Sequence, residues 1–240
     1  MSPRRRTAEA PLSEDANAIV AIAAHELKNA LGGIGVVVAR CEQKLSRGRP
    51  VTADDLAIAR SELRRLSALV NDLLDGARVD LGVVHLRTSR LDIVALTREV
   101  VEMFRAARGR PVAASLPSES IVIEADGERL WGLLINYLEN ADKYAPSPAE
   151  IEVSISVSLD RRRVRISVRD EGPGIQPEDQ ARLFQRYFRA PALARRTRGL
   201  GLGLYLCRAI AEAHGGAVGV DSVPGAGATF WVDLPRLDSG

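Results

Sequence analysis

Apolar side chains recur at alternating intervals of three and four residues through the first eighty positions, with one interruption. This spacing forms the heptad seam of helices that pack side by side. The interruption, Arg-Gly-Arg-Pro at residues 47–50, predicts a turn. We therefore expect two helices, over residues 13–46 and from Thr52 to about residue 79, folded into an antiparallel hairpin. The seam positions are Val20, Ala24, Leu27, Leu31, Ile34, Val38, Cys41 and Leu45, then Leu56, Ala59, Leu63, Leu66, Val70, Leu73 and Ala77.

The ends of this hairpin carry helix signals of their own. Ser13 is a typical N-cap residue, and Thr52 followed by Asp55 resembles a capping box with Asp in place of Glu. Residues 1–12 are expected to form a disordered tail. A hairpin of this size cannot bury its seam alone, whereas two copies can bury it as a four-helix bundle. We therefore expect a homodimer.

The second region, from residue 83 to 237, has a different pattern. Residues 151–159 and 163–170 alternate apolar and polar side chains, which predicts two half-buried strands joined as a hairpin. Helices interleaved with mostly antiparallel strands favour a two-layer α/β sandwich, so the whole chain is assigned to the α+β class. The other expected elements are helices over 91–104, 128–144 and 200–214, and strands over 121–125, 217–221 and 229–234.

Composition narrows the function classes. The 240 residues are 46% hydrophobic and 27% charged, and the net charge of +2 does not favour nucleic-acid binding. No apolar run approaches the roughly 18 residues of a membrane span, and no secretory signal is visible. We expect Cys41 and Cys207 to be small buried hydrophobes of a cytoplasmic protein, and no Cys or His cluster has metal-ligand spacing.

A histidine lies just beside the seam of the first helix. His25 follows the seam residue Ala24, which places it at the bundle surface. An ordinary imidazole is largely neutral at pH 7 and can attack a phosphorus centre. Glu26 beside it can orient the ring or accept its proton, and Asn29 lies one turn along the same face. Taken alone, the pattern is better explained by an ordinary solvent-exposed histidine.

The helix expected over 128–144 carries a polar stripe. Asn136, Asn140 and Lys143 are spaced to share one face. Amide oxygens suit Mg²⁺ and a lysine suits phosphate, so the stripe predicts a metal–phosphate site. Asparagine is a poor residue for a helix interior, which argues for a functional role. As an isolated pattern, however, a solvated polar face explains the stripe equally well.

Two glycine-rich segments follow strands or open a helix. Residues 170–175, Asp-Glu-Gly-Pro-Gly-Ile, put a carboxylate at a strand end, where it can accept a hydrogen bond from the exocyclic amine of adenine. Residues 199–204, Gly-Leu-Gly-Leu-Gly-Leu, place bare amides at a helix start, where phosphate binds. The basic segment 195–198 is a candidate lid. Plain turns and a solvated loop are the alternative interpretations.

Together these segments resemble the sensor histidine kinases of two-component systems over residues 13–236. Each motif is modest alone, but six in the family's order are specific. The matching segments are His25–Asn29 for the phosphoacceptor box, 136–144 for the asparagine box, 183–188 for the phenylalanine box, and 170–175, 199–203 and 225–230 for the glycine boxes.

The resemblance implies a dimerisation and phosphotransfer domain over residues 13–79 and a Bergerat-type ATP-binding catalytic domain over 83–237. It implies that His25 accepts the γ-phosphoryl group of Mg-ATP with help from Glu26, and that Asn140 binds Mg²⁺. The phosphoryl group would then pass to the receiver domain of a response regulator, whose dephosphorylation Asn29 would support. The other implied nucleotide contacts are Asn136, Lys143, Tyr144, Asp170, Gly172, Gly174, Gly199, Gly201, Gly203 and Thr229.

The chain departs from the family pattern at Ala30, where the family usually has a proline that bends the helix. It also lacks a recognisable sensor segment, so it is either a fragment or a protein that receives its signal from a separate sensory protein. Residues 76–82 are the expected hinge between the two domains. Two rival functions stay open at this point. One is another ATPase with the same nucleotide fold, of the gyrase, mismatch-repair or anti-sigma serine kinase type. The other is a phosphotransfer scaffold with a degenerate ATP domain.

Overall fold

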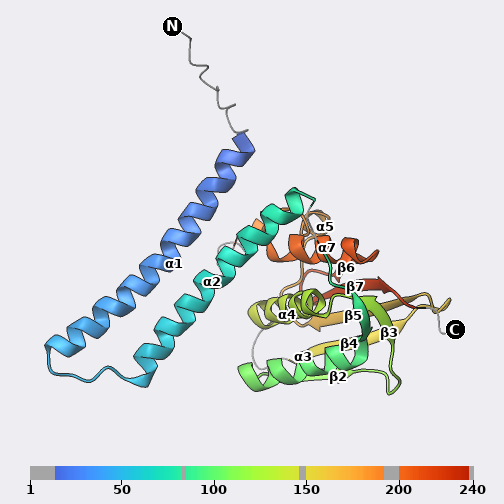
Figure 1. The fold of residues 1–240 in the computed structure, drawn as a ribbon, viewed down its shortest axis with the longest axis horizontal. Coiled ribbons are helices and arrows are strands. Elements are labelled where there is room, and N and C mark those ends of the chain that lie inside the picture. Colours follow the sequence, from blue (N-terminus) through green and yellow to red (C-terminus); the bar gives the residue numbers. More distant parts are fainter. Residues whose placement is uncertain (1–13, 83–84, 146–149, 192–199, 238–240) are drawn as a thin grey trace, which may run out of the picture. The chain divides into compact units, whose positions relative to one another are not determined.

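The chain divides into two compact units, residues 1–71 and residues 72–240. The computed structural model describes residues 14–82, 85–145, 150–191 and 200–237, and Figure 1 shows their helices and strands. The first unit contains helix α1 (Glu14–Ser46) and most of helix α2 (Ala53–Asp80). From Asp72 onwards α2 belongs to the second unit. Ser13, the expected N-cap of α1, lies outside the described residues.

The start of α2 carries the predicted capping box. The backbone N–H of Thr52 donates to the Asp55 carboxylate at 2.9 Å, and the Asp55 N–H donates to the Thr52 hydroxyl at 3.4 Å. Asp55 is buried and also forms ion pairs with Lys44 and Arg40 of α1. The hydrogen bond from Lys44, and then those from Thr52, hold the pKa of Asp55 well below its usual range. One carboxylate therefore both caps α2 and ties it to α1.

The buried apolar residues of the described hairpin lie one position away from the predicted seam. They are Ala30, Val37 and Leu69, and α1 runs unbroken through Ala30. Alternate members of the predicted seam, spaced by sevens on each helix, are exposed instead. These residues are Leu31, Val38 and Leu45 on α1 and Leu56, Leu63 and Val70 on α2.

The second unit is built on two sheets. Its main sheet has the strand order β2-β4-β5-β7-β6, in which β2 pairs with β4 in parallel and the other pairs are antiparallel. A small sheet pairs β1 with β3. The strands are β1 (Ser89–Asp92), β2 (Val112–Ser115), β3 (Val122–Ala125), β4 (Ile151–Val157), β5 (Arg163–Asp170), β6 (Ala217–Ser222) and β7 (Ala228–Pro235).

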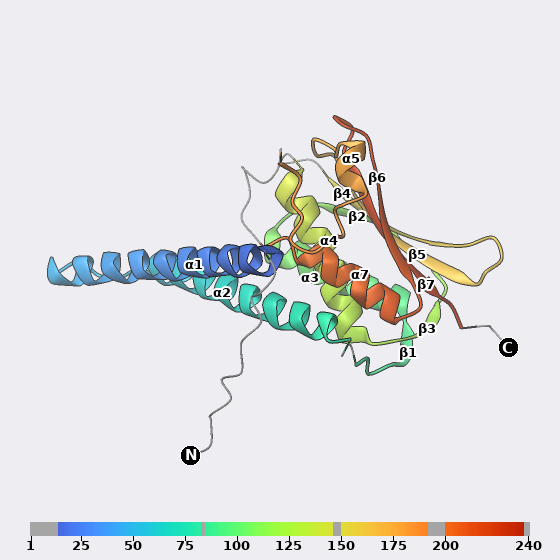
Figure 2. The same cartoon turned by 90° about the horizontal axis from the view of Figure 1, so that it is seen from above.

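Helices cover one face of the main sheet, as Figure 2 shows. They are α3 (Ile93–Arg108), α4 (Gly127–Tyr144) and α7 (Gly203–Ala213), and the short α5 (Pro177–Gln180) lies near β6. Residues of β5 alternate between buried and less buried, as expected for a sheet with one covered face. The two-layer α/β arrangement predicted for this region is confirmed, and its core lies between the helices and the sheet.

Several predicted boundaries were wrong. Leu91 was expected in a helix, but it lies in β1, and Asp92 caps α3 through hydrogen bonds from the N–H groups of Val94 and Ala95. The helix expected from residue 200 begins at Gly203. Strands β1 and β2 were not predicted, because each is only four residues long and is stabilised by pairing with a distant strand.

Candidate functional site

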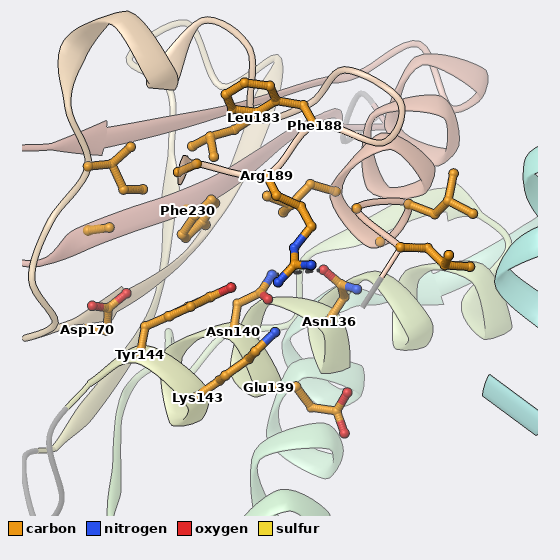
Figure 3. Close-up of a pocket in the computed structure, with 18 of the residues that line it drawn as sticks. Asn136, Glu139, Asn140, Lys143, Tyr144, Asp170, Leu183, Phe188, Arg189 and Phe230 are labelled. Carbon is orange, nitrogen blue, oxygen red and sulfur yellow. Dashed lines mark hydrogen bonds between the residues drawn. The ribbon is translucent and has the colours of Figure 1, made fainter. Parts of the chain in front are cut away.

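The second unit contains a cavity of about 280 Å³ at one end of helix α4, shown in Figure 3. This volume is near the lower end of small-molecule sites, which span about 300–1,000 Å³. The walls come from α4, the end of β5, the loop after it, residues 183–190, the start of α7 and the start of β7. Predicted site residues that line the cavity are Asn136, Asn140, Lys143, Tyr144, Asp170, Gly174, Gly201 and Gly203.

Helix α4 presents the polar stripe because its opposite side belongs to the core. Asp126 caps its start by accepting a hydrogen bond from the Arg129 N–H at 3.1 Å. Leu130, Leu134 and Tyr137 are buried against the sheet and neighbouring helices. The remaining face carries Asn136, Asn140 and Lys143 into the cavity. The predicted spacing thus brings the two amides and the ammonium to one wall.

The two amides are held in register with each other. The Asn140 amide N–H donates to the Asn136 amide oxygen at 3.1 Å. A Cβ atom at Gly203 would lie 2.2 Å from the Asn136 amide nitrogen, so a side chain at this position would displace the Asn136 amide from its present place. Asn136 is therefore packed between Asn140 and the first turn of α7, where unpaired backbone N–H groups favour an anion.

Asp170 lies at the other end of the cavity, where β5 ends. Only 4% of it is exposed, and its carboxylate accepts a hydrogen bond from the Gly172 N–H at 2.7 Å. Burial raises the pKa of Asp170, and the Gly172 N–H acts in the opposite direction. Gly172 contacts Asp170 but does not line the cavity itself. The cavity thus has a buried carboxyl group at one end and amides with a lysine at the other.

Three charged residues at the cavity were not predicted. Arg189 points toward Asn136 and Asn140 in Figure 3. It directly follows the predicted phenylalanine box, so its position in the sequence could have indicated it. Glu139 lines the cavity from α4, and Asp72 lines it from the end of α2. Burial, followed by the charges of Asp75 and Glu139, raises the pKa of Asp72 to about 6. No local pattern marks Asp72 as a site residue, because it lies within α2, whose apolar spacing indicates only helix packing.

Among the described residues, two predicted contacts, Gly172 and Thr229, do not line the cavity. Thr229 alternates along β7 with Ala228 and Phe230, which do line the cavity, so its side chain lies on the opposite face of the strand. The family resemblance implied Thr229 as a nucleotide contact, whereas its two neighbours in β7 are the residues that line the cavity. Gly199 lies outside the described residues, as does the proposed lid at 195–198.

The histidine face belongs to the first unit. His25 and Asn29 are both exposed on α1, one turn apart. The backbone of Glu26 is part of the same helix, and its side chain is not among those described. His25 and Asn29 are therefore exposed, as predicted.

The donor set around the cavity favours a metal that arrives with phosphate. Within the described ranges, no three His, Cys, Asp or Glu side chains group so that they could hold a metal ion. Amide oxygens are ligands of the kind that Mg²⁺ accepts, and Mg²⁺ usually completes its shell with phosphate oxygens and water. Asn140 therefore fits as a single protein ligand. None of the described helices combines the length and apolar character that crossing a bilayer requires.

Comparison with known families matches both parts of the chain. Residues 16–82 match the His Kinase A (phospho-acceptor) domain. Residues 125–238 match the family described as histidine kinase-, DNA gyrase B-, and HSP90-like ATPase. The two matches do not overlap, and they fall on the helical hairpin and on the cavity-bearing region.

Individual relatives agree with these matches. Sensor protein KdpD of Escherichia coli K12 is 33% identical over 92% of this chain and 24% of its own length. Adaptive-response sensory kinase SasA of Thermosynechococcus vestitus is 32% identical over 90% of this chain and 59% of its own length. The chain thus spans less than two thirds of the length of these curated relatives.

Solved structures show the same arrangement of elements. Full-length ShkA in complex with AMPPNP matches 92% of this chain and 46% of its own, with a TM-score of 0.64 and 30% identity. The catalytic domain of histidine kinase ThkA matches 62% of this chain and 96% of its own, with a TM-score of 0.54 and 27% identity.

Proposed function

Because this chain belongs to the sensor histidine kinases of two-component systems, we propose that it binds Mg-ATP in the α4 cavity and transfers the γ-phosphoryl group to His25. The observation that carries the proposal is the polarity of the cavity. A buried carboxyl group, Asp170, marks one end, and Asn136, Asn140, Lys143 and Arg189 line the other. A nucleotide has the matching polarity, with an amine-bearing base at one end and a polyanion at the other.

Asp170 is the residue we assign to the base. A carboxylate at the closed end of a pocket accepts a hydrogen bond from an exocyclic amine, which adenine has and guanine lacks at that position. The Gly172 N–H keeps the carboxylate oriented by donating to one oxygen. Phe230 and Leu183 supply apolar surface beside it. This end of the site therefore selects the base and does not take part in the chemistry.

The amide and cationic end is assigned to the phosphates. When bound, Mg²⁺ would neutralise charge on the phosphate oxygens, and Asn140 is the side chain that would hold it. Lys143 and Arg189 place positive charge around the same space, and Asn136 extends the wall toward the start of α7. Phosphoryl transfer needs mainly positioning and charge stabilisation, so this set of residues suits it.

His25 is the proposed acceptor. A nitrogen of its neutral ring attacks the γ-phosphorus, a P–N bond forms, the bond from phosphorus to the bridging β–γ oxygen breaks, and ADP leaves. We assign Glu26 to accept the ring proton. His25 lies in the first unit and the cavity in the second, so transfer requires the two to meet. Of the expected hinge, Gly76 lies inside α2 and contacts Leu202, whereas Leu81 and Gly82 form a turn.

We also propose that the chain forms a homodimer, passes its phosphoryl group to a response regulator and supports dephosphorylation of that regulator. The exposed heptad residues of both helices support a homodimer. A response regulator would take the phosphoryl group from His25 onto an aspartate. Asn29, exposed one turn from His25, would support dephosphorylation of the regulator by positioning a water that attacks its aspartyl phosphate and releases inorganic phosphate.

The test is labelling with γ-³²P-ATP at millimolar Mg²⁺. The unmodified chain should acquire label that is lost in acid and kept in base, as a phosphoramidate is. His25→Gln should abolish the label while leaving binding of Mg-AMPPNP within twofold. An acid-stable label would favour the serine kinase alternative, and label on His25→Gln would refute the assignment.

A further inference from the structure

The last residue of helix α2 contacts two other parts of the second unit. The Asp80 carboxylate accepts a hydrogen bond from the Tyr205 hydroxyl of α7 at 3.0 Å and forms an ion pair with Arg186. Burial, and then this hydrogen bond, raise the pKa of Tyr205. Asp80 thus joins the end of α2 to the segment before Arg189 and to the helix that follows the glycine-rich segment.

Arg186 directly precedes a strained residue. Tyr187 has a φ of 61°, a left-handed conformation that non-glycine residues rarely adopt. The Arg186 guanidinium lies 4.6 Å from the centroid of the Tyr187 ring. The Tyr187 N–H donates to the carbonyl of Gly201 at 3.0 Å. A strained residue persists only where its surroundings hold it, and Arg186 is one of the groups that hold Tyr187.

The held segment continues directly into the cavity wall. Phe188 and Arg189 line the cavity, and Arg189 points toward Asn136 and Asn140 in Figure 3. Gly201 has a φ of 70°, and a Cβ atom there would lie 2.7 Å from the Phe188 carbonyl oxygen, so the two cavity segments are in close contact. Arg186 and Arg189 thus belong to one short segment that is held against Gly201.

We propose that Asp80 is a positioning residue for the nucleotide: by holding Arg186 and Tyr205, it fixes the Tyr187 turn that aims Arg189 at the phosphate end of the cavity. This inference rests on the proposed function. It places the end of the hairpin helix in control of a cavity side chain. A displacement of the last turn of α2 would accordingly be felt at Arg189.

The exposure of the pair indicates which effect to measure. The side chains of Arg186 and Asp80 are 31% and 34% exposed, and ion pairs as exposed as this contribute little to folding stability. Loss of the pair should therefore change nucleotide affinity and phosphorylation more than thermal unfolding. If the pair had a purely structural role, its loss would leave nucleotide affinity and phosphorylation unchanged, or it would lower the midpoint of thermal unfolding.

A double-mutant cycle tests the route through Arg189. Asp80→Asn and Arg189→Ala are made singly and together, and binding of Mg-AMPPNP is measured by calorimetry alongside the rate of autophosphorylation. We expect Asp80→Asn to weaken binding about three- to tenfold, and to add less than about twofold when Arg189 is already alanine. Tyr205→Phe, which removes one hydrogen bond and keeps the ion pair, should have a smaller effect in the same direction.

Asp233→Asn is the matched control. Asp233 pairs with Arg165 at 3.1 Å, its side chain is 21% exposed, and it does not line the cavity. Asp233→Asn should leave the affinity for Mg-AMPPNP unchanged. Unchanged affinity in Asp80→Asn, or a full additive loss in the Arg189→Ala background, would overturn the proposal. Failure of the unmodified chain to bind Mg-AMPPNP would instead overturn the proposed function, and the positioning role with it.

Discussion

The hairpin and the cavity-bearing unit bury their apolar side chains to different extents. In the described part of the hairpin, Ala30, Val37 and Leu69 are the buried apolar residues, while leucines at heptad positions face solvent. In the second unit, three helices and the main sheet close over a continuous core. The exposed stripe of the hairpin is the surface that the proposed homodimer would bury, whereas the second unit already encloses its own apolar interior. The proposed dimerisation therefore concerns the hairpin and not the cavity-bearing unit.

The largest effect should come from a charge placed on the exposed heptad stripe. Leu63→Asp removes two leucine side chains from a symmetric interface, each worth about 1.5–3 kcal/mol, so dimer affinity should fall at least about 100-fold. Sedimentation equilibrium measures it. Ile58→Asp is the control, because Ile58 is equally apolar and exposed but lies off the stripe. Equal dissociation constants for the two variants would contradict the assigned interface.

A core truncation should act on the second unit alone. Ile166 lies on the central strand β5 and is 1% exposed, so Ile166→Ala should lower the free energy of unfolding of this unit by about 2–5 kcal/mol. Urea unfolding followed by Trp131 and Trp231 fluorescence reports on this unit, since both tryptophans belong to it. Helicity of the hairpin should persist. Loss of both parts in one transition would show that they are not independent.

A smaller, pH-dependent effect is expected in the hairpin. The pKa of Asp55 is lowered in the folded state by Lys44 and Thr52, so its stabilising contribution is complete above the unfolded-state pKa, about 3.9. That contribution is lost as the pH falls below this value toward the folded-state pKa. Asp55→Asn should lower the thermal midpoint at pH 7 and flatten its acid dependence. A midpoint with the same slope below pH 4 in both proteins would exclude this role.

Features that depend on neighbouring residues were predicted from the sequence, whereas features that depend on contacts between distant residues were not. The hairpin, its capping box at Thr52 and Asp55, and the stripe on α4 depend on spacing within one helix, and the structure places all of them as expected. Strand β1, by contrast, exists because Leu91 pairs with Ile123 across the small sheet, and nothing near Leu91 in the sequence indicates that partner.

The same distinction applies to the site. Asp170 and most of the glycines were found because short motifs mark them. Thr229 was misplaced because the pleat of β7 decides which of two neighbours faces the cavity, and that choice depends on pairing with β5 and β6. Asp72 was missed because it reaches the cavity from a helix whose own pattern describes a different contact. A residue such as Asp72, which reaches the site from a helix that carries no site motif, leaves no signal in the sequence around it.

Mapping the phosphate on the chain shows whether a nucleotide bound along α4 phosphorylates His25. The chain is incubated with Mg-ATP, digested at neutral pH and analysed by tandem mass spectrometry, with Asn140→Ala as the paired sample. We expect one phosphopeptide, modified on His25, that is absent from the Asn140→Ala sample. Phosphate on another residue, or equal modification of His25 in both samples, would contradict it.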